Sequence, residues 1–246
     1  MRRLLPVPST PDEPEVDLVE AYAYPPDRTW LRANMVASLD GAAQAPDGLS
    51  AGLSSPADKR VFGVLRGLAD VIVVGAATVR QEGYRPPRPR PAYAAARAAA
   101  GQLPAPVIAI VSRSLAIDFT TPLFTEAVTP TIVITCEEAQ PKGLAAAAEY
   151  GDVLLAGRDR VDLGVALDAL AARGLTRQLT EGGPHVLAQI AACGRLDELC
   201  LTVSPLLTSG PAHRLLAGPT LAEAQAMRPI SILEEDGALF SRYVRA

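Results

Sequence analysis

Short apolar runs alternate with amphipathic stretches along most of the chain. Apolar runs that are each followed by apolar positions at helical spacing are typical of strands in a parallel sheet with helices on both faces. The predicted strands are 31–38, 71–74, 107–111, 131–135, 153–155, 177–180 and 198–203. The predicted helices begin near residues 55, 77, 143, 163 and 184. The alternation therefore predicts an α/β fold with a mostly parallel central sheet.

The two ends of the chain depart from this alternation. Residues 232–235 and 239–244 alternate apolar and polar positions like an antiparallel hairpin, so the sheet should have antiparallel C-terminal edge strands. Residues 1–28 are rich in proline and acidic residues and predict an N-terminal arm lying over the domain. Residues 29–246 then form a single domain, in which the proline-dense stretch 85–106 is an insertion and not a boundary.

Two strand-to-helix junctions have the composition of phosphate-binding turns. In Thr-Glu-Gly-Gly-Pro at 180–184, paired glycines let the backbone approach a ligand, and Pro184 suits the first helical position. The free N–H groups and the helix dipole would then face an anion. A similar junction, Gly75 followed by Thr78, ends the strand 71–74. Two such junctions favour one extended phosphate ligand, although a tight turn at 182–183 and a helix cap at Thr78 explain the same residues.

Composition narrows the classes of partner. The chain of 246 residues is 49% hydrophobic, and its net charge is −4 with no basic stripe, so neither nucleic acid nor an anionic membrane is an expected partner. Prolines interrupt the N-terminus before any signal-peptide segment forms, and we expect a cytoplasmic protein. Three cysteines and two histidines at unrelated spacings predict neither a disulfide framework nor a metal site.

Three segments together resemble a known family. They are residues 33–41, residues 69–79, and residues 180–184 continued through 196–205. This combination resembles the reductase domain of the bifunctional riboflavin-biosynthesis deaminase/reductase, and most closely the stand-alone pyrimidine-reductase-like proteins of actinobacteria. The resemblance covers roughly residues 29–246, and the zinc signature of the deaminase half has no counterpart here.

The resemblance implies a fold, a reaction and an assembly. The fold would be a dihydrofolate reductase-like three-layer sandwich, and the protein would be a homodimer. The reaction would be NADPH-dependent reduction of 5-amino-6-(5-phosphoribosylamino)uracil, by hydride transfer to C1 of the ribose.

The resemblance also implies a cofactor site at the two junctions. The residues it assigns to NADPH are Gly75, Ala76, Thr78 and Val79 at the first junction and Glu181, Gly182, Gly183, Pro184, His185 and Val186 at the second. Ser112 and Arg113 would hold the adenosine 2′-phosphate, because a hydroxyl beside a guanidinium suits that group. Both also fit ordinary loop residues, and His185 would contribute only its backbone N–H.

The candidate substrate residues are Asn34, Ser38, Asp40, Lys59 and Arg60, and the candidate catalytic residue is Asp58. Two of these positions depart from the family pattern: Asn34 stands where a lysine is usual, and Asp58-Lys-Arg stands where an alanine and an arginine are usual. An acid at position 58 resembles dihydrofolate reductase, whose carboxylate pairs with an aminopyrimidine edge and helps to deliver a proton.

Simpler roles fit the same residues. Ser55 to Asp58 has the spacing of a capping box, so Asp58 would only cap a helix. Lys59 and Arg60 fit solvated helix charges, and Asp40 with Gly41 fits a turn.

Two other functions therefore stay open. The first is reduction of dihydrofolate or another pterin through Asp58. The second is an NADPH-binding protein without turnover that acts as a regulator.

Overall fold

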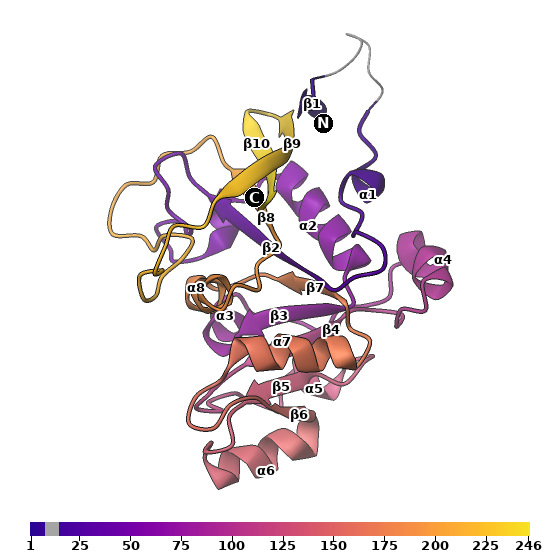
Figure 1. The fold of residues 1–246 in the computed structure, drawn as a ribbon, viewed down its shortest axis with the longest axis vertical. Helices are drawn as coiled ribbons and strands as arrows, with labels where there is room; N and C mark the ends of the chain where they lie inside the picture. The colour runs from indigo at the N-terminus through magenta and orange to yellow at the C-terminus, as the bar shows by residue number, and fades with distance from the viewer. Residues whose placement is uncertain (8–14) are drawn as a thin grey trace.

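Ten strands form one sheet in the part of the chain that the computed structural model describes, residues 1–7 and 15–246 (Figure 1). The strands are β1 Arg2–Leu5, β2 Trp30–Ala37, β3 Val71–Gly75, β4 Val107–Val111, β5 Ile132–Thr135, β6 Asp152–Leu155, β7 Arg177–Thr180, β8 Glu198–Val203, β9 Met227–Glu235 and β10 Ala238–Arg245. Their order in the sheet is β1-β9-β10-β8-β2-β7-β3-β4-β5-β6.

The sheet is parallel from β8 to β6 and antiparallel at its other edge. β2 pairs in parallel with both β7 and β8, and β3, β4, β5 and β6 continue the parallel part. β10 pairs antiparallel with β8 and β9, and β9 pairs antiparallel with β1. The predicted fold class, a mostly parallel sheet with antiparallel C-terminal edge strands, is confirmed. Because the strands from β8 to β6 are parallel, their carboxyl ends all lie along one edge of the sheet.

Helices cover both faces of the sheet and make it the middle of three layers (Figure 1). The helices are α1 Leu18–Ala21, α2 Pro56–Leu68, α3 Ala76–Gln81, α4 Pro91–Ala99, α5 Pro122–Thr125, α6 Pro141–Tyr150, α7 Leu163–Ala172 and α8 Pro184–Ala192, with a 3₁₀ turn η1 at Ser50–Leu53. None of the helices in the described ranges is long and apolar enough to cross a lipid bilayer.

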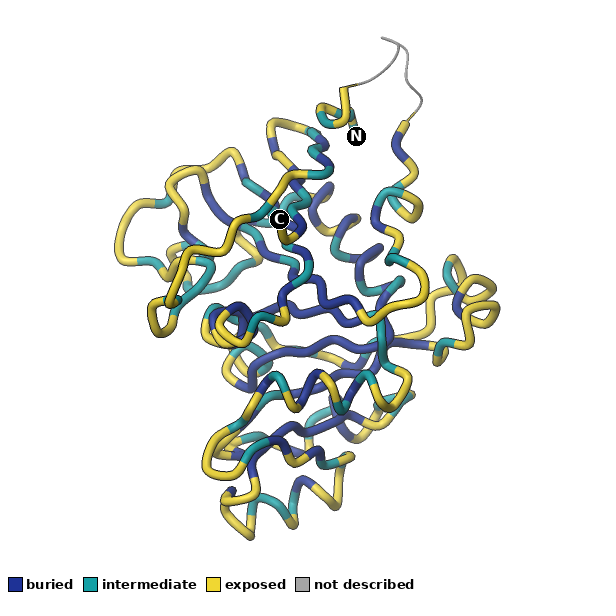
Figure 2. The backbone as a smooth tube through the Cα atoms, in the orientation of Figure 1, coloured by how far each residue is buried: buried dark blue, intermediate teal, exposed yellow. Residues whose placement is uncertain are grey.

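Alternation along the buried strands gives the two faces separate cores. Ile72 and Val74 of β3 join a core with residues of α2, α5 and α6, whereas Val71 and Val73 join a second core with α7 and α8. Successive side chains of a strand point to opposite faces, so a continuous apolar run fills both layers. The centre of the sheet is accordingly buried along its whole length (Figure 2).

The N-terminal segment contributes more to the sheet than the sequence indicated. Residues 2–5 form β1 on the edge of β9, and α1 is capped by the Asp17 carboxylate. Part of the predicted arm, residues 8–14, lies outside the described residues. β1 was missed because two of its four residues are arginines and none of its four residues is fully buried, as is usual at a sheet edge.

Other boundaries also differ from the pattern-based expectation. β9 begins at Met227, five positions before the predicted start at Ile232, because its first residues are exposed and lack alternation. The short helix α5 was not predicted. The alanine-rich part of the insertion 85–106, where the composition predicts a short surface helix, forms α4, which packs on α2.

A buried carboxylate links the N-terminal segment to the sheet. Glu198 of β8 forms an ion pair with Arg32 at 2.9 Å and accepts hydrogen bonds from the side chains of Arg242 and Trp30 at 2.7 and 2.8 Å. Arg32 and Arg242 also donate to the carbonyls of Tyr22 and Ala21. Burial raises the pKa of Glu198, but the two guanidinium groups outweigh it, and the pKa is lowered below its usual value. The carboxylate is therefore charged and paired at neutral pH.

Replacement of this carboxylate should destabilise the fold. We expect Glu198→Ala to lower the free energy of unfolding by about 3–5 kcal/mol, because Arg32 would remain buried without its counter-charge. Urea denaturation measures the loss. The control is Glu138→Ala, whose partner Arg158 is exposed and whose effect should stay below about 1 kcal/mol. Equal losses for the two variants would contradict a central role for Glu198.

Candidate functional site

The two glycine junctions lie against each other at the carboxyl edge of the sheet. β3 and β7 are neighbouring parallel strands, so the turns that follow them meet. The Gly75 N–H donates to the Gly182 carbonyl at 2.9 Å, and the Gly183 N–H donates to the Thr78 hydroxyl at 2.9 Å. The two predicted phosphate turns thus form one continuous backbone surface. The Thr78 hydroxyl of the first turn accepts from the backbone of the second.

Glycine is required at this contact for steric reasons. A Cβ atom on Gly183 would lie 2.6 Å from the Thr78 hydroxyl oxygen, and one on Gly75 would lie 3.1 Å from a Val186 methyl group. Gly182 has φ of +83°, a region that side chains disfavour. Gly183 is the N-cap of α8 and offers no side chain to the first N–H groups of the helix. These donors, which include His185 and Val186, are available to an anion.

A cavity of about 710 Å³ lies beside this surface. Its walls come from β2, the 43–54 loop, α2, the end of α3 and the insertion 85–106. The predicted site residues that line it are Asn34, Asp58, Lys59, Thr78, Glu181, Gly183 and Pro184. A pocket of this size is typical of small-molecule sites.

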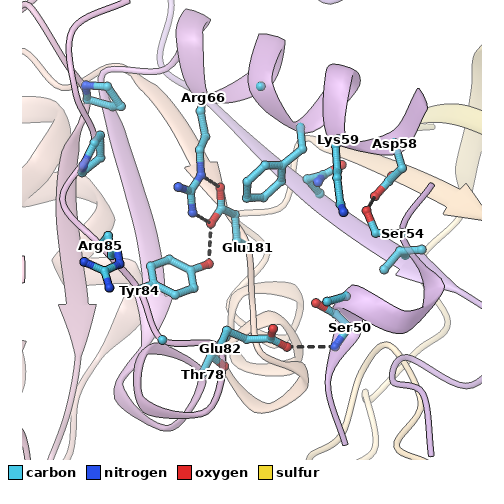
Figure 3. A pocket seen from close by; sticks show the side chains of 18 of the residues that line it. Ser50, Ser54, Asp58, Lys59, Arg66, Thr78, Glu82, Tyr84, Arg85 and Glu181 are labelled. Atoms are coloured by element: carbon cyan, nitrogen blue, oxygen red, sulfur yellow. Dashed lines mark hydrogen bonds and ion pairs between the residues drawn. The ribbon is translucent and has the colours of Figure 1, made fainter. Parts of the chain in front are cut away.

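In the middle of the cavity wall, the Glu181 carboxylate accepts hydrogen bonds from two other residues (Figure 3). Arg66 donates to its two carboxylate oxygens at 2.7 and 2.6 Å, and the Tyr84 hydroxyl donates to one of them. The Arg66 guanidinium also lies 4.3 Å from the centre of the Phe62 ring. Burial, and to a smaller extent the nearby Glu181 carboxylate, raises the pKa of Tyr84 well above its usual value. Its hydroxyl therefore stays protonated and remains a donor.

Arg66 and Tyr84 line the cavity but were not among the site residues predicted from the sequence. A signal for Arg66 exists in the helix period, because Asp58, Phe62 and Arg66 are spaced four apart and share one face of α2. Tyr84 carries no such signal. It follows α3 in a turn, and only the folded chain brings it to Glu181.

Asp58 lies at the other side of the cavity, in the first turn of α2 (Figure 3). The helix cap is Ser55, whose hydroxyl oxygen accepts from the Asp58 N–H at 3.1 Å. The Asp58 carboxylate accepts instead from the Ser54 hydroxyl at 2.5 Å. The backbone of Asp58 therefore takes part in the cap, while its carboxylate, held by Ser54, lines the cavity.

Three predicted substrate residues lie outside the cavity. Ser38 and Asp40 form a turn that is tied to a distant loop, because Asp40 accepts from the Ser38 hydroxyl at 2.5 Å and from the Ser209 N–H at 2.7 Å. These hydrogen bonds lower the pKa of Asp40 far below its usual value. Arg60 forms an ion pair with Glu235 of β9.

Ser112 and Arg113 follow β4 at the same edge of the sheet. Val111 pairs with Gly75, so Ser112 comes one residue beyond the first junction, on the neighbouring strand. The Ser112 hydroxyl oxygen accepts from the Leu115 N–H, and Arg113 uses its Nε atom to bind the Asp159 carbonyl at 2.8 Å. Ser112 is buried and Arg113 is exposed.

The remaining predicted cofactor residues belong to the first turns of the two helices. Ala76 and Val79 of α3 pack into the core. Val186 packs into the opposite core, and the His185 ring lies 6.0 Å from that of His213. Any contribution of Ala76, Val79 and Val186 to ligand binding would come from their backbone.

Comparison with known proteins gives a consistent answer. The pattern of the RibD C-terminal domain family matches residues 29–235. Over 82% of its length the chain is 31% identical to the 2,5-diamino-6-ribosylamino-4(3H)-pyrimidinone 5′-phosphate reductase of Methanothermobacter thermautotrophicus, of which 90% is covered. The reductase of the same name from Archaeoglobus fulgidus is 24% identical over 89% of the chain and is covered completely.

A solved structure extends the likeness to three dimensions. The crystal structure of a pyrimidine reductase-like protein from Corynebacterium diphtheriae matches with a TM-score of 0.79 and 29% identity. The match covers 89% of this chain and 92% of that protein, so the two share nearly the whole fold.

Proposed function

The chain belongs to the RibD C-terminal domain family, and we propose that it is an NADPH-dependent reductase of a ribosylaminopyrimidine 5′-phosphate in riboflavin biosynthesis. The reductase class follows from the family and from the two relatives named as such reductases. The single observation that carries the proposal at the site is the meeting of the two glycine junctions beside a cavity that Asp58 and Glu181 line.

The residues present fit a nicotinamide dinucleotide. Gly75, Gly182 and Gly183 leave no room for side chains at the junction contact, and α8 begins with uncapped N–H groups. Such a surface suits a diphosphate, which accepts hydrogen bonds and carries negative charge. When bound, the cofactor would supply the hydride for the reduction. The chain itself would hold the diphosphate on the N–H groups of His185 and Val186.

Ser112 and Arg113 support NADPH over NADH. They lie one strand beyond the junction contact, and Arg113 uses one nitrogen to bind Asp159 and keeps its other guanidinium donors for a ligand. A guanidinium beside a hydroxyl binds phosphate through charge-assisted hydrogen bonds. We assign these two residues to the 2′-phosphate.

The Asp58 carboxylate favours a 2-aminopyrimidinone substrate over a uracil. Its carboxylate accepts hydrogen bonds, and a 2-amino-4(3H)-pyrimidinone presents an amino N–H beside a ring N–H. Uracil replaces that amino group by a carbonyl oxygen, which would repel the carboxylate. The two relatives are named for the diamino compound. We therefore favour 2,5-diamino-6-ribosylamino-4(3H)-pyrimidinone 5′-phosphate over the aminouracil that the sequence resemblance implied.

The experiment that tests the function is the initial rate of NADPH oxidation by the purified protein. The substrates compared are the diaminopyrimidinone phosphate, 5-amino-6-(5-phosphoribosylamino)uracil and dihydrofolate. We expect the diaminopyrimidinone to react fastest. Turnover of dihydrofolate alone would overturn the proposal in favour of a pterin reductase, and tight NADPH binding without turnover of any of the three would favour a regulator.

Replacement of the Asp58 carboxylate should separate its two candidate roles. Asp58→Asn keeps the backbone N–H that Ser55 caps, so the melting temperature should stay unchanged. We expect kcat/KM for the diaminopyrimidinone to fall about 10- to 100-fold, because the amide offers one acceptor where the carboxylate offers two. A loss of about 1 kcal/mol in stability with normal turnover would instead assign Asp58 to the cap.

Replacement of Arg113 should change cofactor preference. We expect Arg113→Ala to raise KM for NADPH about 10-fold or more and to leave KM for NADH unchanged, because only NADPH has a 2′-phosphate. The control is Arg158→Ala, an exposed arginine paired with Glu138, which should alter neither value. Equal losses for both cofactors in Arg113→Ala would contradict the assignment.

We also propose that the chain forms a homodimer through the sheet face that β8 and β10 present. Leu199, Leu201 and Val203 of β8 are only half-buried, and Leu239 of β10 is 37% exposed. A row of apolar side chains on an incompletely covered sheet face is typical of an interface. Light scattering at micromolar concentration should give twice the chain mass, and Leu201→Glu should give the monomer mass. A monomeric wild-type protein would refute the proposal.

A further inference from the structure

Residues 205–226 connect β8 to β9 without forming a helix or a strand, and they appear as the orange-to-yellow loop in Figure 1. This segment packs against α8. The Ala217 N–H donates to the carbonyl of Pro184, the first residue of the helix, at 3.2 Å. A Cβ atom on Gly218 would lie 2.9 Å from the Ala188 side chain, so the two backbones approach closely. The segment therefore lies beside the helix whose first turn is assigned to the cofactor.

The middle of the segment contacts both candidate binding regions. The His213 carbonyl accepts from the Ala43 N–H at 3.0 Å, and Ala43 lines the cavity. The centre of the His213 ring lies 6.0 Å from that of His185, the second residue of α8. The His213 side chain is thus next to the helix turn whose N–H groups would hold the diphosphate.

The two imidazole rings are available to a ligand. Both histidines are exposed, and neither ring forms a hydrogen bond within residues 1–7 and 15–246. An imidazole keeps at least one N–H donor whether it is neutral or charged. No group of three metal-ligating side chains occurs in the described part of the chain, so a metal centre does not account for this pair. The rings are therefore hydrogen-bond donors without an acceptor.

The turn after β2 holds the start of the segment in place. The Asp40 carboxylate accepts from the N–H groups of Ser209 and Thr208 at 2.7 and 3.2 Å. Beside it, the Leu39 N–H donates to the Leu206 carbonyl at 2.8 Å. Asp40 therefore fixes the chain shortly after it leaves β8 and a few residues before His213.

The same carboxylate holds Ser209 in an unfavourable backbone conformation. Ser209 has φ of +59°, a region that costs free energy for a residue with a Cβ atom. Such a conformation persists only where the surrounding contacts enforce it, and here the enforcing contact is the hydrogen bond to Asp40. Loss of the carboxylate would let the turn relax and would move the residues that follow it.

We propose that the rings of His213 and His185 donate hydrogen bonds to the cofactor diphosphate, and that Asp40 is the positioning residue for His213. This inference rests on the proposed function and adds two side chains to a site built so far from backbone N–H groups. A diphosphate is negatively charged and has several acceptor oxygens, so ring donors beside the start of α8 strengthen its binding. Asp40 then acts on the cofactor and not, as the sequence indicated, on the substrate.

The first experiment is fluorescence titration with NADPH in the absence of a pyrimidine. We expect His213→Ala and Asp40→Ala each to raise Kd about 10-fold, the effect of one lost hydrogen bond to a charged group. His213→Gln keeps an N–H donor and should bind nearly as the wild type does. The matched control is Asp17→Ala, which removes another exposed carboxylate that accepts from two backbone N–H groups, and Kd should not change. An unchanged Kd in His213→Ala or Asp40→Ala would overturn the proposal.

A second variant tests whether Asp40 acts through the strained turn. Glycine adopts a positive φ without cost, so a glycine at position 209 needs no carboxylate to hold it. We expect Asp40→Ala combined with Ser209→Gly to recover most of the NADPH affinity that Asp40→Ala loses. General loosening of the fold would not be recovered in this way. A double variant that binds as weakly as Asp40→Ala would refute the positioning role.

Adenosine 2′-monophosphate assigns the effect to the diphosphate. This probe carries the part of NADPH given to Ser112 and Arg113 but lacks the diphosphate. Its affinity, measured by competition with NADPH, should be the same in the wild type, His213→Ala and Asp40→Ala. Equal losses for the two ligands would contradict a contact with the diphosphate.

Neither titration needs turnover, so this inference and the proposed function fail separately. NADPH binding that depends on His213 supports the inference even if none of the three substrates reacts. Normal turnover of the diaminopyrimidinone with a Kd that does not depend on His213 would refute the inference and leave the proposed function standing. A wild-type protein that binds no NADPH would overturn both.

Discussion

The contact between the Gly75 N–H and the Gly182 carbonyl is the constraint on which the site depends. It exists because β3 and β7 are neighbours in a parallel sheet, so that the turns after both strands leave the same edge. The hydrogen bond from Gly183 to Thr78 makes a second link between these turns. A Cβ atom on Gly183 would lie 2.6 Å from the Thr78 hydroxyl oxygen and would displace this link, beside which α8 begins without a side-chain cap.

The cavity follows from how α2 lies beside this contact. One face of the helix carries Asp58, Phe62 and Arg66, which puts a carboxylate, an aromatic ring and a guanidinium in a row along the cavity. Arg66 then fixes Glu181, and Glu181 fixes the Tyr84 hydroxyl, so β7, α2 and the turn after α3 are joined through one carboxylate. Charged groups in such a network cost much less to bury when every one of them is paired.

The Glu198 ion network and the candidate site lie at different parts of the sheet. The Glu198 network lies where β2, β8 and β10 meet and binds the segment around Tyr22, while the glycine contact lies at β3 and β7. The buried side of β8 is thus used by an ion network, whereas its other side presents leucines that are only half-buried. The candidate binding residues therefore lie in loops at the carboxyl edge, apart from the packed centre.

The sequence by itself determined the strand and helix alternation, the two glycine junctions and the family. Hydrophobic periodicity, apolar runs and glycine pairs depend only on residues that are close in the sequence, so the sequence alone reveals them. It also placed Asp58 and Lys59 on the first turn of a helix, which the structure brings to the cavity. The sequence alone therefore predicts the fold class and several of the residues that line the cavity.

Only the tertiary structure decided which of these elements meet. Periodicity shows which side chains share a face of one helix or strand, but it does not show which distant element packs against that face. Tyr84 donates to Glu181, which is 97 residues away in the sequence, and so becomes part of the cavity wall. Arg60 pairs with Glu235, 175 residues away, and therefore lies outside the cavity. The arginines of the insertion look like ordinary surface charge in the sequence. They line the cavity in the folded chain, where Gly63 and Gly67 of α2 leave space for Arg90 and Tyr93.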